Sequence, residues 1–214
     1  MKGACANGRL VVLFAGVGGQ GGLSAARFLG EAGHRLGLAL TVSQLHGMSQ
    51  RGGAVQASVC FGSDQVVALG RAGVDVLVVL ELLEALRVAD RVDGHTTVLC
   101  NRWLSPPPAA ALSRQKVPTE DEVLDALRKR AGTVRVVDAV KLAERAGSRG
   151  AANAVMLGAL TALPGFPVPA EALARVVSAA STGRMVGVNE RALAFGAAAL
   201  GEGAIASEKA GAAV

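Results

Sequence analysis

Residues 10–22, LVVLFAGVGGQGG, join a short apolar run to a turn made largely of glycine. A short apolar run that ends at glycines is typical of a fully buried strand, which we place over residues 9–15. Apolar residues then recur at helical spacing over residues 20–37, and a second apolar run covers residues 38–42. A strand, a tight turn, a helix and a second strand make a βαβ unit, which requires a parallel sheet. The stretch therefore predicts an α/β fold.

The rest of the chain extends this pattern with further strands and helices. Thr119 and Glu122 have the spacing of a capping box, which predicts a helix that begins there. Pro169 suits the first helical position of a later helix. Further strands are predicted over residues 54–61, 74–80, 95–100 and 133–137, a helix over 81–92, and only helices after Asp138, over about 138–147, 150–163, 169–182 and 188–202.

We expect a Rossmann-like, mostly parallel open sheet of five or six strands. Helices should cover both faces of the sheet, and a helical C-terminal section should follow it. Residues 1–203 are expected to form a single domain. Residues 204–214 contain mainly glycine, alanine and charged side chains, and they are expected to be a flexible tail.

Composition limits the classes of partner. Of the 214 residues, 51% are hydrophobic and 18% are charged, so the chain can bury a sizeable core. Basic residues outnumber acidic ones by 22 to 17 but are scattered, and aromatics make up only 3%, which argues against a nucleic-acid reader. The apolar runs are shorter than the roughly 18 to 20 residues that span a membrane. We therefore expect no nucleic-acid or membrane partner and a cytoplasmic location.

The three cysteines argue against a metal centre in this chain. Cys5, Cys60 and Cys100 lie far apart, and an iron–sulfur cluster usually takes four thiolates. Cys60 and Cys100 fall within apolar runs that resemble strands, so we expect both to be buried. A sparse, odd number of cysteines fits a reducing compartment.

The glycine turn satisfies only half of the dinucleotide-binding fingerprint. Gly16, Gly18 and Gly21 have the G-x-G-x-x-G spacing between a strand and a helix. The fingerprint also needs an acidic residue about 20 residues later, where it binds the ribose hydroxyls. Residues 41–44, TVSQ, contain no acid, so NAD binding is disfavoured. Two alternatives stay open: the turn holds another anion with its backbone N–H groups, or it only packs helix against strand.

A second feature follows the second strand. Residues 43–53, SQLHGMSQRGG, are polar and rich in glycine, which predicts a loop. Loops at the carboxyl edge of an open α/β sheet carry ligand sites, although such a loop can also merely cover the edge. The chain has no nucleophile elbow, paired-carboxylate motif, metal-ligand spacing or P-loop lysine, so a self-sufficient hydrolase or metalloenzyme is disfavoured.

Together, the turn and the loop resemble the gamma-type domain of the 2-oxoacid:ferredoxin oxidoreductases, and most closely the small subunits of the indolepyruvate type. Asn153 with Leu157-Gly158, and Asn189 with Ala192 and Gly196, resemble two C-terminal helices of that family. The resemblance covers residues 9–200, although a larger apolar residue is more usual in the family where Gly22 stands.

The resemblance implies a multi-subunit enzyme that oxidatively decarboxylates a 2-oxoacid, such as an aryl pyruvate, with coenzyme A. The products would be an acyl-CoA, carbon dioxide and reduced ferredoxin. Thiamine diphosphate and [4Fe-4S] clusters would belong to a large partner subunit, which agrees with the few cysteines here. This chain would bind that subunit, hold none of these cofactors itself, supply no catalytic residue and be inactive alone.

The resemblance also implies which residues would line a cofactor site or an interface. Arg51 would pair with a carboxylate or phosphate, and His46 would form a hydrogen bond across the loop. Gly52 and Gly53 would let backbones approach closely. The full set is Gly16, Gly18, Gly19, Gln20, Gly21, Ser43, His46, Met48, Gln50, Arg51, Gly52, Gly53, Asn153 and Asn189.

Two other hypotheses remain at this stage. One is a stand-alone nucleotide-binding Rossmann-like protein, which would bind NAD(P) or a flavin. The other is a homo-oligomeric structural protein without a ligand. A homodimer of the isolated chain is left open under each of these hypotheses and under the family resemblance.

Overall fold

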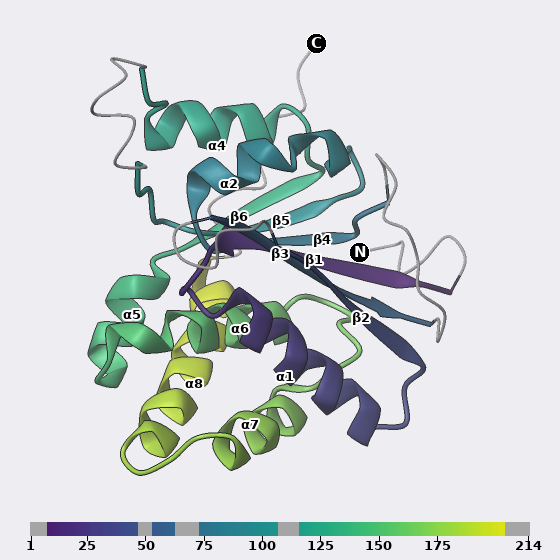
Figure 1. The fold of residues 1–214 in the computed structure, drawn as a ribbon, viewed down its shortest axis with the longest axis vertical. Helices are drawn as coiled ribbons and strands as arrows, with labels where there is room; N and C mark the ends of the chain where they lie inside the picture. Colours follow the sequence, from purple (N-terminus) through teal and green to yellow (C-terminus); the bar gives the residue numbers. More distant parts are fainter. Residues whose placement is uncertain (1–7, 47–52, 63–72, 107–115, 204–214) are drawn as a thin grey trace.

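The computed structural model describes residues 8–46, 53–62, 73–106 and 116–203. They form one sheet with helices packed on both faces (Figure 1). The strands are β1 (Leu10–Val17), β2 (Leu40–His46), β3 (Ala54–Phe61), β4 (Val76–Val79), β5 (Thr97–Asn101) and β6 (Thr133–Val137). The helices are α1 (Gly22–Arg35), α2 (Leu82–Arg87), α4 (Glu120–Arg128), α5 (Ala139–Ala146), α6 (Ala152–Thr161), α7 (Ala170–Ala179) and α8 (Met185–Gly203), with short 3₁₀ turns at Ala89–Arg91 and Arg149–Ala151.

The sheet has the order β2-β3-β1-β4-β5-β6 and is mostly parallel, as predicted. Strand β3 is the exception, because it runs antiparallel to both of its neighbours, β1 and β2. The predicted βαβ unit is present in its chain order, but β3 lies between its two strands. Strands β1, β4, β5 and β6 pair in parallel, so their carboxyl ends lie at one edge of the sheet.

The prediction of a loop over residues 43–53 was wrong for its first four residues. Strand β2 continues to His46, because β3 pairs with it along its whole length, from Leu40 opposite Phe61 to His46 opposite Val55. β2 is an edge strand, and edge strands tolerate polar side chains that meet solvent. Gln44 is exposed and Ser43 is half-buried. The polar composition that suggested a loop therefore belongs to a strand edge.

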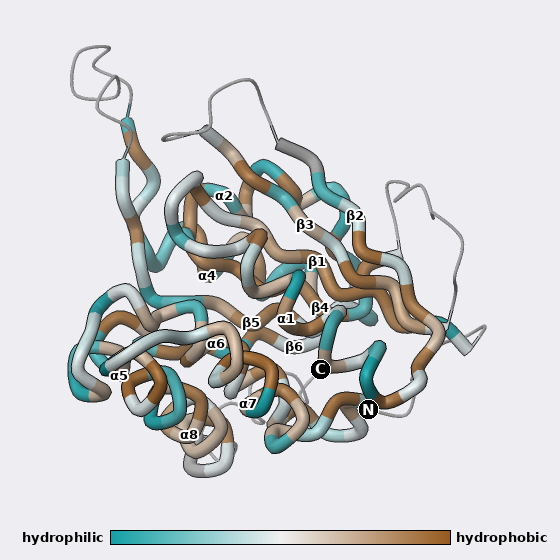
Figure 2. The backbone as a smooth tube through the Cα atoms, turned by 60° about the horizontal axis from the view of Figure 1, so that its bottom comes forward, coloured by the Kyte–Doolittle hydropathy of each residue, from teal (hydrophilic) through white to brown (hydrophobic). Residues whose placement is uncertain are grey.

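Two hydrophobic cores cover the two faces of the sheet. Side chains alternate along β1, so Val12 and Phe14 join the core under α1 and α5–α8, whereas Val11 and Leu13 join the core under α2 and α4. Figure 1 shows the same division, with α2 and α4 on one side of the strands and the other helices opposite. The apolar segments run through the middle of the fold in Figure 2.

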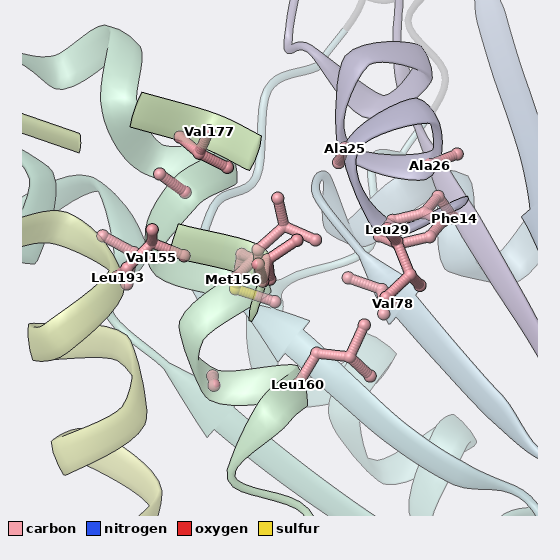
Figure 3. Packing of buried hydrophobic residues seen from close by; sticks show 14 of the residues in the cluster. Phe14, Ala25, Ala26, Leu29, Val78, Val155, Met156, Leu160, Val177 and Leu193 are labelled. Atoms are coloured by element: carbon pink, nitrogen blue, oxygen red, sulfur yellow. The ribbon is translucent and has the colours of Figure 1, made fainter. Parts of the chain in front are cut away.

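The larger core ties the C-terminal helices to the sheet. Phe14 of β1, Leu29 of α1 and Val78 of β4 meet on one side of it, and Val155 of α6 faces Leu193 of α8 on the other (Figure 3). All five side chains are at most 6% exposed. The helical C-terminal section predicted from the sequence is therefore part of the same folded unit as the sheet.

Two glycines allow α6 and α8 to cross at very short range. A Cβ built on Gly158 would overlap the carbonyl of Leu193, and one built on Gly196 would overlap the carbonyl of Val155. Backbones approach this closely only where no side chain separates them. The glycines of the two C-terminal motifs therefore have a packing role.

Several smaller predictions can be compared with the structure. The capping box is confirmed: the Glu122 carboxylate accepts the Thr119 N–H at 2.8 Å, and the Thr119 hydroxyl accepts the Glu122 N–H at 3.3 Å. Pro169 is the N-cap of α7 rather than its first helical residue. Cys60 and Cys100 are buried, as expected. Cys5 and the predicted tail 204–214 lie outside the described residues, and none of the helices described is long and apolar enough to cross a membrane.

Candidate functional site

The glycine turn between β1 and α1 is braced by its own glutamine. The Gln20 side-chain oxygen accepts the Val17 N–H at 2.9 Å, and the Gln20 N–H donates to the Val17 carbonyl at 3.1 Å. Gly19 and Gly21 have φ values of 98° and 79°, in the left-handed region that glycine occupies without strain. The turn therefore has a fixed shape that depends on glycine at both positions.

The end of the second motif meets this turn. The Gly18 N–H donates to the Gly53 carbonyl at 2.9 Å, which ties the turn to the residue that precedes β3. Ser43 lies within β2 opposite Ser58, and His46 ends that strand opposite Val55. Met48, Gln50, Arg51 and Gly52 lie outside the described residues. The structure thus brings the two motifs together at Gly18 and Gly53.

A first pocket lies at the N-terminus of α1, and we call it the α1 pocket. Its volume is about 480 Å³, and its lining includes Gly18, Gly22, Leu23, Ser24 and Gln44. Within the described part of the chain no side chain caps α1, and no acidic residue lies in its first turn. The first backbone N–H groups of a helix lack partners within the helix and carry partial positive charge. The α1 pocket therefore favours an anion.

A second pocket lies on the other side of the turn, and we call it the Trp103 pocket. Its volume is about 370 Å³, and its lining includes Gln20, Leu80, Trp103, Arg149 and Asn153. The Arg149 guanidinium lies over the Trp103 ring, 4.4 Å from its centroid. Sequence reasoning missed Trp103 and Arg149, because neither belongs to a motif. Trp103 follows β5 and Arg149 precedes α6, so only the tertiary fold brings the two side chains together.

The two asparagines of the C-terminal motifs have different places. Asn153, at the start of α6, reaches the turn: its amide Nδ2 donates to the Gly21 carbonyl at 3.4 Å. Its Oδ1 accepts the Ala154 N–H at 2.9 Å. Asn189 instead donates to the Ser181 hydroxyl at 2.8 Å, and it lines neither pocket. Only the first asparagine therefore joins the candidate site.

Buried polar groups hold the walls of the Trp103 pocket. The Glu81 carboxylate is 1% exposed and accepts the Ser105 N–H at 2.8 Å and the Glu84 N–H at 3.0 Å. Burial raises the pKa of Glu81, and the backbone hydrogen bonds oppose that rise. The Leu82 N–H donates to the Trp103 carbonyl at 2.8 Å. The segment that carries the indole is therefore hydrogen-bonded to the start of α2 at two points, Trp103 and Ser105.

The described residues contain no group of three or more histidine, cysteine or acidic side chains that could hold a metal ion. Cys100 is fully buried in β5, and burial raises the pKa of its thiol to about 12. A thiol in that state is a poor metal ligand, because metals bind the thiolate.

Comparisons with known proteins place this geometry in a family. The family model of pyruvate ferredoxin/flavodoxin oxidoreductases matches residues 11–199. The chain is 35% identical over 188 residues to the indolepyruvate oxidoreductase subunit IorB of Archaeoglobus fulgidus, with 88% of this chain and 94% of that protein covered. It is 37% identical over 193 residues to the subunit IorB of Thermococcus kodakarensis, with 89% and 96% covered.

Solved structures share the fold. The pyruvate oxidoreductase subunit PORC of Thermotoga maritima has a TM-score of 0.67 and 25% identity, with 89% of this chain and 96% of that chain covered. A 2-oxoglutarate:ferredoxin oxidoreductase of Magnetococcus marinus has a TM-score of 0.70 at 20% identity, with 91% of this chain matching 31% of that one. The comparisons favour the oxidoreductase hypothesis over a stand-alone nucleotide-binding protein. The chain belongs to the pyruvate ferredoxin/flavodoxin oxidoreductase family, as its paired motifs had indicated.

Proposed function

We propose that this chain is the small subunit of a cytoplasmic 2-oxoacid:ferredoxin oxidoreductase that acts on indolepyruvate or another aryl pyruvate. The names and the near-complete coverage of the Archaeoglobus and Thermococcus relatives support this substrate class. The chain would act with a large subunit that holds thiamine diphosphate and [4Fe-4S] clusters and passes electrons to ferredoxin. Residues 1–203 would form the single domain that binds this subunit, and the family match over 11–199 supports that extent.

The described residues do not offer a site for the clusters, so no step through them is assigned to this chain. Coenzyme A is different, because the α1 pocket fits one of its phosphate groups. An uncapped helix N-terminus favours a phosphate, and residues 22–24 would supply the backbone N–H groups. When bound, coenzyme A supplies the thiol that takes up the acyl group.

The observation that carries this proposal is the hydrogen bond between the Gly18 N–H and the Gly53 carbonyl. It joins the glycine turn to the end of the SQLHGMSQRGG segment beside the α1 pocket. Both motifs then contribute to one anion site at the carboxyl edge of the sheet, where open α/β sheets bind ligands. Arg51 would add a planar cation to the same site, as its place in the motif implies.

The first experiment tests the subunit assignment. The chain is co-expressed with its large subunit, and reduction of methyl viologen is measured with indolepyruvate and coenzyme A. We expect turnover by the complex and none by the chain alone. Dye reduction by the isolated chain, or a complex that is inactive with all aryl pyruvates, would contradict the proposal.

The second experiment tests the coenzyme A site in that complex. Ser24 is exposed at the third helical position of α1 and lines the α1 pocket. Ser24→Asp places a negative charge there, which stabilises a helix N-terminus by about 0.3–1 kcal/mol but repels a phosphate. We expect the KM for coenzyme A to rise about tenfold or more, from the loss of roughly 1.4 kcal/mol, while the melting temperature stays equal or rises.

Ser24→Ala is the matched control, because it removes the hydroxyl without adding a charge. Its KM for coenzyme A should stay close to that of the wild type. An unchanged KM in Ser24→Asp would remove coenzyme A from the α1 pocket and would leave the subunit assignment intact.

A further inference from the structure

The Trp103 pocket has properties that the proposed function does not use. Among the residues that the structure describes, its lining shares only Gly19 with that of the α1 pocket, so the glycine turn separates two distinct pockets. Its volume of about 370 Å³ is near the lower end of the roughly 300–1,000 Å³ usual for small-molecule sites. A compact ligand suits it better than a long cofactor.

Arg149 is the charged group of this pocket. Its guanidinium stacks on the Trp103 ring at 4.4 Å, which restrains a side chain that is otherwise long and mobile. Across residues 8–46, 53–62, 73–106 and 116–203, no carboxylate lies within ion-pair distance of Arg149. A stacked guanidinium keeps the N–H groups at its edge, and these suit a carboxylate.

Three other polar side chains of the lining, Asn101, Asn153 and Gln20, have partners within the fold. Asn101 donates to the Leu80 carbonyl at 3.0 Å and accepts the Ala139 N–H at 3.2 Å. The Asn153 amide donates to the Gly21 carbonyl, and the Gln20 side-chain oxygen accepts the Val17 N–H. Arg149 is the one cation among the described residues of the lining.

The remaining surface of the pocket is apolar. Leu80, Val140 and Ala152 line it together with the Trp103 indole. A single cation beside apolar walls suits a ligand with one negative charge and an apolar body. A phosphate ester or pyrophosphate carries more charge and would need further cations. The pocket is also preorganised, because hydrogen bonds with Glu81 and Asn101 hold the segments that form its walls.

We propose that the Trp103 pocket binds a small organic monocarboxylate with a planar apolar body. Its carboxylate pairs with Arg149, and its body lies against Leu80 and Val140. The site is separate from the one proposed for coenzyme A, and the lining described above comes from this chain.

The chain offers a direct optical test. Trp103 is its only tryptophan and tyrosine is absent, so the emission excited at long wavelength reports on this pocket alone. The full-length chain is titrated with phenylacetate, a monocarboxylate with an aromatic body. We expect a saturable change in emission. Phenylacetamide has the same shape without the charge, and we expect it to bind about tenfold more weakly or worse, since it cannot form the charge-assisted hydrogen bonds that a carboxylate forms with a guanidinium.

Variants are compared by isothermal calorimetry, which does not depend on the indole. Arg149→Gln should lose phenylacetate binding by about tenfold or more. Arg145→Gln is the matched control, because Arg145 also stacks on an aromatic ring, that of Phe195 at 5.1 Å, but lies outside the lining. It should bind as the wild type does, and circular dichroism checks that both variants fold.

Three results would overturn the proposal. They are the absence of saturable binding of phenylacetate to the wild type, equal affinity for phenylacetamide, and unchanged affinity in Arg149→Gln. Inorganic phosphate is added as a competitor, and displacement of phenylacetate at equimolar phosphate would also reject a carboxylate site.

Discussion

Gly21 and Asn153 show how a single residue position joins distant parts of the chain. Gly21 has a φ of 79°, and a Cβ built on it would lie 2.5 Å from the Asn153 Nδ2. Gly19 has a φ of 98°, but a Cβ built there would meet none of the described residues within 4 Å. The need for glycine at both positions could be predicted from the turn pattern. The contact with Asn153 could not, because 132 residues separate the two.

We therefore predict that Gly21→Ala destabilises the chain more than Gly19→Ala. Both substitutions force alanine into the left-handed region, which costs about 1–2 kcal/mol. Gly21→Ala adds a steric clash worth roughly 1–3 kcal/mol. Urea unfolding measures both, and the double variant Gly21→Ala/Asn153→Ala should recover the excess, because the clash partner is gone. Equal losses in the two single variants would show that Asn153 moves aside freely.

Glu81 leads to a prediction about pH. Burial raises the pKa of Glu81 in the folded chain above the ordinary value of 4.5, and the charge of Glu84 acts in the same direction. Burial also raises the pKa of Glu84 itself. The folded state then binds a proton more readily than the unfolded state, so stability is full below about pH 4.5 and falls as pH rises through the raised pKa. Glu81→Gln removes one of these two carboxyl groups. As the pH rises from about 4.5 through the raised pKa, we therefore expect the melting temperature of the variant to fall less than that of the wild type.

The measurement is a series of thermal unfolding curves from pH 4 to pH 8 for both proteins. Glutamine has one acceptor oxygen in place of two, so the variant should also be less stable at every pH, by about 1–3 kcal/mol. Parallel curves for the two proteins would mean that Glu81 does not titrate in this range. The difference in slope is the informative quantity, because other carboxyl groups contribute equally to both.

At the scale of elements, local pattern predicted strands and helices well where one face is buried. The strands over 54–61 and 133–137 begin and end where expected, and each C-terminal helix lies within a few residues of its prediction. The direction of β3 and the extension of β2 to His46 were missed. Both depend on pairing with a strand elsewhere in the chain, and a local pattern carries no information on the partner.

The crossing of α6 and α8 leads to a prediction with a control in the same helix. Gly196→Ala places a Cβ against the Val155 carbonyl, so the helices must separate, at a cost of about 1–3 kcal/mol or more. Gly201, also in α8, has no described residue within 4 Å of a built Cβ. Gly201→Ala should be neutral or stabilise by up to about 1 kcal/mol, since alanine favours helix. Unfolding in guanidinium compares them, and similar effects at both sites would contradict close helix packing.

At the scale of the whole molecule, the topology places the segments that line the two pockets at one edge of the sheet. The turn after β1, Gly53 before β3 and the residues that follow β4 and β5 all lie there. The sequence motifs could predict the first two, since they repeat a family pattern. They could not predict the Trp103 pocket, because Leu80, Trp103, Val140 and Arg149 match no motif and come from separate parts of the chain.

The same layout predicts which surface the large subunit of the proposed complex would cover. Since both pockets open at the carboxyl edge, we expect assembly to slow amide hydrogen exchange in residues 17–24. The first N–H groups of α1 have no partner within the helix, so they should exchange quickly in the isolated chain. Residues 92–96 precede β5 at the opposite edge and serve as the internal control, with no change expected on assembly.

Mass spectrometry of the complex and of the isolated chain after equal exchange times gives both rates. Addition of coenzyme A to the assembled complex should slow residues 22–24 further, because a bound phosphate accepts their N–H groups. Protection confined to α7 and α8, with residues 17–24 unchanged, would place the large subunit on the helical face instead. The carboxyl edge would then stay open to solvent in the complex, and neither pocket would lie next to the proposed large subunit.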